Sequence, residues 1–155
     1  KLLKQNYQKS WKNMIISIKE IIIFAKKNKI QIDFETEGSV NASDHLLMQK
    51  PIEYKRFMKM FSKKKIGINL NIGHLNLASK KFKFDKFKFI KDVSDYIVAF
   101  ECSHNYGKND NHLPLIKKAW YWKVLKNEKY KDIPKILEFR YVGIKKILNS
   151  VKLFS

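Results

Sequence analysis

The fold of this chain is constrained most by four predicted strands. They alternate with predicted helices, and each strand ends in a polar residue. The strands end at Glu35, Asn71, Glu101 and Glu138. In a chain of alternating strands and helices the strands run parallel, so their carboxyl ends lie on one face of the sheet. Active sites of such folds collect on that face. The sequence therefore predicts one shared site at the strand ends.

Hydrophobic periodicity and turn residues give the boundaries of these elements. Predicted helices cover 7–28, 51–62, 85–91, 119–125 and 142–154, and predicted strands cover 31–35, 66–71, 95–101 and 135–139. Gly73 and His74 are expected to form a turn after the second strand. Polar loops are expected at 36–50, where His45 should lie at the surface, and at 102–118. Loops as long as the second one are often functional in compact domains.

A leading helix followed by four strand–helix units predicts a single α/β domain over residues 1–155. Four such units are half of an eight-stranded α/β barrel, whose usual size is about 250 residues. An open four-stranded parallel sheet is the alternative, and its edges would be exposed. No glycine-rich phosphate loop follows any strand, which argues against a dinucleotide-binding fold. The chain lacks an initiator Met and is expected to begin within a longer protein.

The net charge of +19 has two explanations, a nucleic-acid surface or a bias toward AT-rich codons. Of the 33 basic residues only Arg56 and Arg140 are arginine, the residue that nucleic-acid readers favour for its bidentate fork. Codon bias explains the composition better, and a nucleic-acid partner is not expected. No apolar run reaches the roughly 20 residues of a membrane span. With one cysteine, Cys102, no signal peptide and no membrane segment, a cytoplasmic location is expected.

Short motifs at the strand ends resemble the xylose-isomerase-like TIM barrels, which include sugar phosphate isomerases and epimerases and endonuclease IV. Asn69-Leu-Asn-Ile-Gly-His74 is similar to the family's strand–Asp–x–Gly–His motif. The loop 103–114, Ser-His-Asn-Tyr-Gly-Lys-Asn-Asp-Asn-His-Leu-Pro, is similar to the family's Ser–Asp–Asn–x–Gly–x–x–Asp–x–His–Leu–Pro. The segments 33–38 and 135–139 resemble the strands that carry two Glu ligands. In order, these matches correspond to the C-terminal half of the barrel, with the N-terminal half absent.

The resemblance implies a role for each strand-end residue. Glu35 and Glu138 stand where the family places two carboxylates that bind a metal and exchange the substrate's proton, an arrangement suited to chemistry beside a carbonyl. Glu101 and His104 would complete a site for Mn²⁺, Zn²⁺ or Mg²⁺ with these two residues. The expected groups that contact substrate are His74, Asn71, Asp110 and His112. The expected function is thus a metal-dependent sugar or sugar-phosphate isomerase or epimerase.

Departures from the family pattern leave two alternatives open. Asn71 replaces an Asp, Glu101 and His104 exchange acid and imidazole, and Leu115–Lys118 stands where the family has Gly–x–Gly. One alternative is an endonuclease IV-like phosphodiesterase, and the other is a non-catalytic, truncated remnant. A half barrel also predicts a partner, either the missing N-terminal half or a second copy of the chain.

Overall fold

The computed structural model describes residues 6–39 and 46–155, so His45 and the rest of 40–45 lie outside the described residues. The helices are α1 (Tyr7–Lys27), α2 (Pro51–Met60), α3 (Ile72–Lys81), α4 (Lys86–Val93), α5 (Trp122–Leu125) and α6 (Ile144–Val151), with a 3-10 turn η1 (Glu128–Tyr130). The strands are β1 (Asp33–Glu35), β2 (Gly67–Asn71), β3 (Ile97–Cys102) and β4 (Lys135–Leu137). The alternation of strands and helices is as the sequence predicts.

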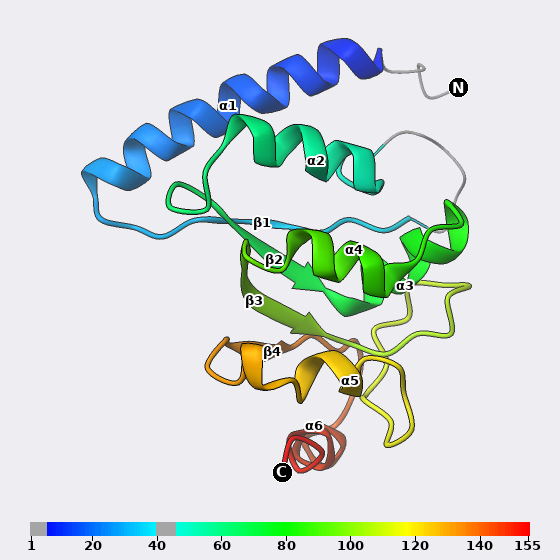
Figure 1. Ribbon diagram of the computed structural model, residues 1–155. Helices are drawn as coiled ribbons and strands as arrows, with labels where there is room; N and C mark the ends of the chain where they lie inside the picture. The colour runs from blue at the N-terminus through cyan, green and yellow to red at the C-terminus, as the bar shows by residue number, and fades with distance from the viewer. Residues whose placement is uncertain (1–5, 40–45) are drawn as a thin grey trace.

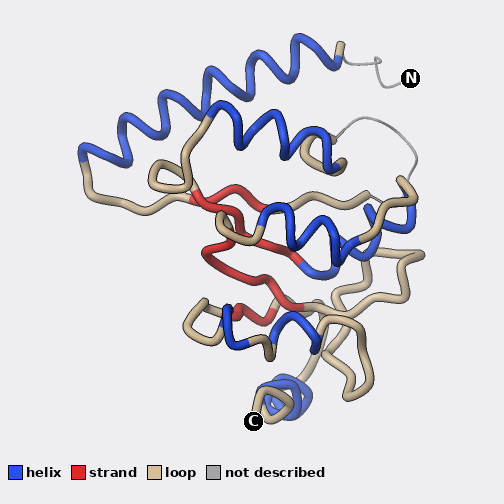
Figure 2. The backbone as a smooth tube through the Cα atoms, in the orientation of Figure 1, coloured by secondary structure: helices blue, strands red, loops and turns tan. Residues whose placement is uncertain are grey.

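The four strands form one parallel sheet in the order β1-β2-β3-β4. Phe34 pairs with Ile68, Asn71 with Glu101, and Cys102 with Leu137, so neighbouring strands end nearly level. Helices cover one face of the sheet, while α1 and α6 lie at its opposite ends, beyond β1 and β4 (Figures 1 and 2). This is the α/β architecture that the sequence predicts, a set of parallel β/α units as found in TIM barrels.

The core lies between the sheet and its helices because their apolar side chains meet there. Phe57 of α2 is fully buried and its ring centroid lies 5.7 Å from that of Phe34 in β1. Tyr54 packs edge-on to Phe89 of α4 at 4.9 Å. Full burial of side chains of this size contributes roughly 1.5–3 kcal/mol each. This packing holds the strands, and with them the residues at their ends, in a fixed relation.

The main departure from prediction is α3, which begins immediately after β2. A turn was predicted at Gly73 and His74, but both residues lie in the first turn of this helix. Asn71 ends β2 and caps α3, because its side-chain oxygen accepts a hydrogen bond from the His74 amide at 3.0 Å. The predicted turn was therefore wrong, and the correction places His74 rigidly above the strand ends.

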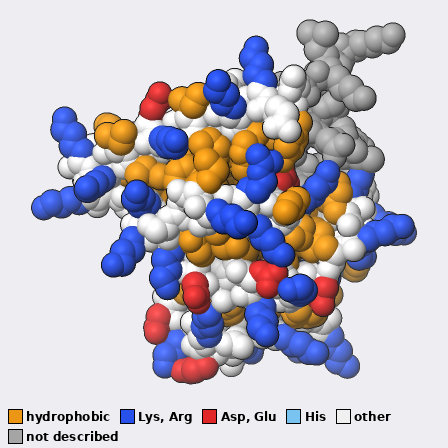
Figure 3. All heavy atoms as spheres, turned by 45° about the horizontal axis from the view of Figure 1, so that its top comes forward, with side chains coloured by type: hydrophobic (Ala, Val, Ile, Leu, Met, Phe, Trp, Pro, Cys, Tyr) orange, Lys and Arg blue, Asp and Glu red, His pale blue; other side chains and the backbone are white. Residues whose placement is uncertain are grey.

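Lysine and arginine side chains are spread over the visible face of the molecule rather than gathered in one stripe (Figure 3). Apolar patches lie between them. The spread is consistent with a compositional origin of the positive charge. Among the described residues, no helix combines the length and apolar character needed to cross a membrane.

Candidate active site at the strand ends

Residues from all four strands meet at the carboxyl end of the sheet, around the side chain of Asn71. Glu35 is the last residue of β1, Glu101 lies within β3, and Glu138 directly follows β4. The Asn71 side-chain nitrogen Nδ2 lies 3.0 Å from Glu35 Oε1, 3.0 Å from Glu101 Oε2 and 3.1 Å from Glu138 Oε2. The convergence that parallel strands predict is therefore present, and the roles of these residues stay predictions.

Two histidines flank this carboxylate cluster. His74 Nδ1 lies 3.0 Å from Glu35 Oε1 and 3.0 Å from the Thr36 carbonyl oxygen. His112 Nδ1 lies 3.0 Å from Glu138 Oε2, close enough for an ion pair although not aligned as a hydrogen bond. The two rings are perpendicular, with centroids 5.9 Å apart. Each of the two outer carboxylates thus has its own imidazole neighbour.

Asp110 joins the two histidines on their other side. Its Oδ2 lies 2.9 Å from His112 Nε2 and 3.8 Å from His74 Nε2. One ligand atom from each of these three residues lies within 4.8 Å of the others, which is the arrangement of a possible metal site. Within the described part of the chain, the buried Asp110 Oδ1 makes no hydrogen bond. Two imidazoles and a carboxylate suit Zn²⁺ or Mn²⁺.

His112 is held in a strained conformation at this site. Its φ of 47° lies in the left-handed region, and its side chain is 1% exposed. A left-handed conformation costs a residue other than glycine roughly 1–2 kcal/mol. Lys29, Met48, Lys83 and Tyr141 also have a positive φ, so the conformation alone does not mark a functional residue. At His112 it sets the direction of the ring, whose Nδ1 lies 3.0 Å from Glu138 Oε2.

Acidic residues are concentrated here in a chain that is otherwise strongly basic. Four of the 14 acidic residues, Glu35, Glu101, Asp110 and Glu138, surround Asn71 and the two histidines, although the net charge is +19. Placing like charges together costs free energy unless a cation or proton joins them. The concentration is what a cation-binding or proton-transferring site requires.

The pKa values follow from these contacts. The hydrogen bond from His74 lowers the pKa of Glu35, which keeps that carboxylate ionised. Burial opposes the charged form of His74, but the hydrogen bond with Glu35 and the charges of Asp110 and Glu35 raise its pKa to about 9. Burial raises the pKa of Glu101, and the charges of Glu35 and Glu138 add to the effect. The cluster thus contains neighbouring carboxyl groups whose pKa values are shifted in opposite directions, a pattern typical of acid–base sites.

His104, predicted as a metal ligand, lies in a different environment from the other three predicted ligands. Its backbone pairs with Leu113 at 2.8 and 2.9 Å, and its ring centroid lies 4.8 Å from Tyr106 and 6.0 Å from Tyr121. Burial lowers its pKa. The structure therefore brings Glu35, Glu101 and Glu138 around Asn71 and places the ring of His104 among aromatic side chains.

Two residues of the site were not predicted. The Thr36 hydroxyl accepts from the Asn71 backbone amide at 2.9 Å and donates to its carbonyl oxygen at 3.3 Å. Asn69 Nδ2 donates to Glu101 Oε1 at 2.8 Å. Side chains of a strand alternate between its two faces, so Asn69 lies on the same face of β2 as Asn71. This alternation could have predicted that Asn69 belongs to the site.

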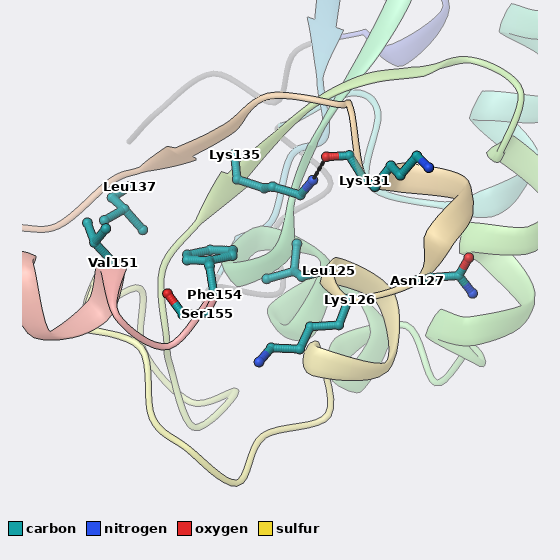
Figure 4. Close-up of a pocket in the computed structure, with 9 residues that line it drawn as sticks. All are labelled: Leu125, Lys126, Asn127, Lys131, Lys135, Leu137, Val151, Phe154 and Ser155. Carbon is teal, nitrogen blue, oxygen red and sulfur yellow. Dashed lines mark hydrogen bonds between the residues drawn. The ribbon is translucent and has the colours of Figure 1, made fainter.

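A separate pocket of about 610 Å³ lies away from this chemistry, on the outer side of β4. Leu125, Leu137 and Phe154 line it with lysine side chains, and the Lys135 ammonium donates to the Lys131 carbonyl oxygen at 2.9 Å (Figure 4). Its lining holds no carboxylate or imidazole. The strand-end cluster, not this pocket, is therefore the candidate active site.

Comparisons with known proteins agree with the fold. A family model described as xylose isomerase-like TIM barrel matches residues 2–152. The crystal structure of a D-tagatose 3-epimerase-like protein superimposes with a TM-score of 0.78 at 23% sequence identity. That match covers 99% of this chain and 56% of the other, so the chain spans little more than half the length of that protein. No curated protein matches the sequence.

Proposed function

Because this chain belongs to the xylose isomerase-like TIM barrel family, we propose that the intact protein is a sugar or sugar-phosphate isomerase or epimerase. One observation carries the proposal. Glu35 ends β1 and Glu138 directly follows β4; both contact the Asn71 amide, and each has a histidine within 3.0 Å. Two carboxylates on either side of a substrate can remove and return the proton next to a carbonyl.

Both carboxylates are accessible to a substrate at the open end of the sheet. Their side chains are 37% and 43% exposed, whereas His112 is almost fully buried. In this proposal the low pKa of Glu35 keeps it ready to accept a proton. His74 and His112 hold the two carboxylates in place.

A divalent metal ion is part of the proposal, and His74, Asp110 and His112 would hold it. A bound ion would polarise the substrate carbonyl and its neighbouring hydroxyl. Glu35 and Glu138, next to the Nδ1 atoms of the two histidines, would then orient the imidazoles, as carboxylates commonly do at metal sites. The ligand set that the sequence suggested, Glu35, Glu101, His104 and Glu138, differs from this one.

Proton exchange at carbon tests the proposal directly. The intact protein would be incubated in D₂O with Mn²⁺ and a panel of ketoses and ketose phosphates, and loss of the proton next to the carbonyl would be followed by NMR. Glu35→Gln and Glu138→Gln should each reduce exchange by roughly 10²–10⁴-fold. Glu37→Gln, which changes a neighbouring carboxyl group, is the matched control and should have little effect. No exchange with any of these sugars would contradict the proposal.

The second candidate is an endonuclease IV-like phosphodiesterase, and the His74, Asp110 and His112 triad favours it. A metal ion held by two imidazoles and a carboxylate could act as the Lewis acid that phosphodiester hydrolysis requires. Cleavage of a duplex containing one abasic site, measured beside sugar exchange, separates the two functions. Neither activity in the intact protein would favour the non-catalytic alternative.

A further inference from the structure

One side-chain nitrogen occupies the centre of the carboxylate cluster. Asn71 Nδ2 lies 3.0–3.1 Å from oxygens of three carboxylates that come from β1, β3 and the segment after β4. Asn71 is 0% exposed. An amide nitrogen has two hydrogens to donate, and here three negatively charged groups gather round it. The amide thus stands where three carboxylates would otherwise hold a cation.

The orientation of this amide is fixed from its other end. Asn71 Oδ1 accepts from the His74 backbone amide and so caps α3. The Thr36 hydroxyl bonds to both the backbone amide and the carbonyl oxygen of Asn71. Rotating the amide by 180° would place an oxygen among the carboxylates and a nitrogen against the His74 N–H. The helix cap therefore requires that a donor, not a ligand oxygen, face the carboxylates.

We propose that Asn71 replaces a metal ion among Glu35, Glu101 and Glu138, so that divalent ions bind on the His74–Asp110–His112 side instead. A neutral amide N–H donor does not ligate a divalent ion. Metal–oxygen distances are about 2.0–2.6 Å, and the space that such an ion needs between these oxygens is filled by the amide. Asn71 is then a positioning residue that fixes Glu35 relative to Glu138. Its use in catalysis rests on the proposed function, but the metal-binding claim does not.

Asn71→Asp tests the claim, because aspartate keeps the acceptor for the His74 amide and replaces the donor with a carboxylate. The variant should gain about one Mn²⁺ or Zn²⁺ ion per chain over the wild type, measured by elemental analysis after equilibrium dialysis. Its melting temperature should rise when Mn²⁺ is added. Adding Glu101→Gln to the variant should abolish the gain. Asn69→Asp is the control: Asn69 contacts Glu101 alone, so this variant should gain no ion.

Glu101→Gln in the wild-type chain keeps the claim testable if Asn71→Asp does not fold. Glu101 contacts both asparagines and lies outside the metal-capable triad. Its substitution should leave the wild-type affinity for Mn²⁺ and Zn²⁺ within about twofold, whereas loss of a true ligand should lower it at least about tenfold.

Three results would overturn it. They are a folded Asn71→Asp variant without an added ion, a wild-type affinity that falls with Glu101→Gln, and a wild type that binds neither Mn²⁺ nor Zn²⁺. All of these measurements are made without substrate, so an inactive protein would contradict the proposed function and leave this inference standing.

Discussion

Replacing Ile144 and Leu148 of α6 with lysine should prevent the chain from pairing with a second copy of itself. β1 and β4 are the edges of the sheet, and among residues 6–39 and 46–155 neither has a neighbouring strand on its outer side. The helices next to these edges carry exposed apolar side chains: Ile144 is 74% exposed and Leu148 54% exposed on α6, and Phe24 is 63% exposed on α1. Four strands and open edges predict that two chains join edge to edge as an eight-stranded barrel.

The size of the effect follows from these exposures. Full burial of an Ile or Leu side chain contributes roughly 1.5–3 kcal/mol, so covering what remains exposed of Ile144 and Leu148 contributes roughly 2–4 kcal/mol together. A two-fold pair of half barrels has two such junctions, which doubles the loss to roughly 4–8 kcal/mol. Since 1.4 kcal/mol corresponds to tenfold in Kd, dimerisation should weaken at least about 10³-fold.

Sedimentation velocity from about 1 to 100 μM would measure this association. Ile52→Lys is the matched control, because Ile52 is 59% exposed but lies on α2, which packs on a face of the sheet and not beyond β4. The control should leave the Kd unchanged. A wild-type chain that stays monomeric at the highest concentration and unfolds cooperatively would refute the reasoning, and so would an equal effect of Ile52→Lys.

Three further results are expected. Glu53→Ala should lower the free energy of unfolding in urea by about 3–5 kcal/mol, because the amides of Gln49 and Lys50 and the Tyr7 hydroxyl lose their acceptor. Tyr7→Phe should cost only about 1–2 kcal/mol, and equal costs would contradict this account. Cys102 should resist alkylation at pH 8 until the chain unfolds, because burial raises the pKa of its thiol to about 12; rapid native labelling by iodoacetamide would argue otherwise. Binding to undamaged duplex DNA, measured by anisotropy, should be weak and should fall steeply between about 50 and 200 mM salt, since lysines contact phosphates without reading bases.

The sequence predicted the strand ends well because two simple regularities control them. Parallel strands place their carboxyl ends together, and apolar residues mark each strand up to its polar end. Glu35, Asn71, Glu101 and Glu138 therefore meet as predicted. The helix α3 was missed because Gly73 has a low helix propensity and resembles a turn residue. Its real signal was Asn71, a strong helix-capping residue at the end of a strand.

The loop after β3 could not be predicted in detail, because tertiary contacts decide which of its polar residues reach the site. The loop folds back on itself where His104 pairs with Leu113, and this turns the ring of His104 toward Tyr106. The left-handed conformation of His112 then directs that ring to Glu138. Few residues other than glycine adopt this conformation, and although histidine is enriched among them, no sequence pattern shows which histidine will do so. The motif predicts that this loop contributes to the site, while only the structure shows that the rings of its two histidines lie in different surroundings.

The position of the candidate site within the chain has a consequence for experiments. The three carboxylates, Asn71 and the His74–Asp110–His112 triad all belong to these four strands and the segments that follow them. Metal binding should therefore be measurable on this chain alone. If the proposed function holds, selection of a sugar should also depend on residues that face the site across the barrel. If Ile144→Lys with Leu148→Lys abolishes pairing but leaves the Mn²⁺ affinity unchanged, metal binding requires only the residues of a single chain.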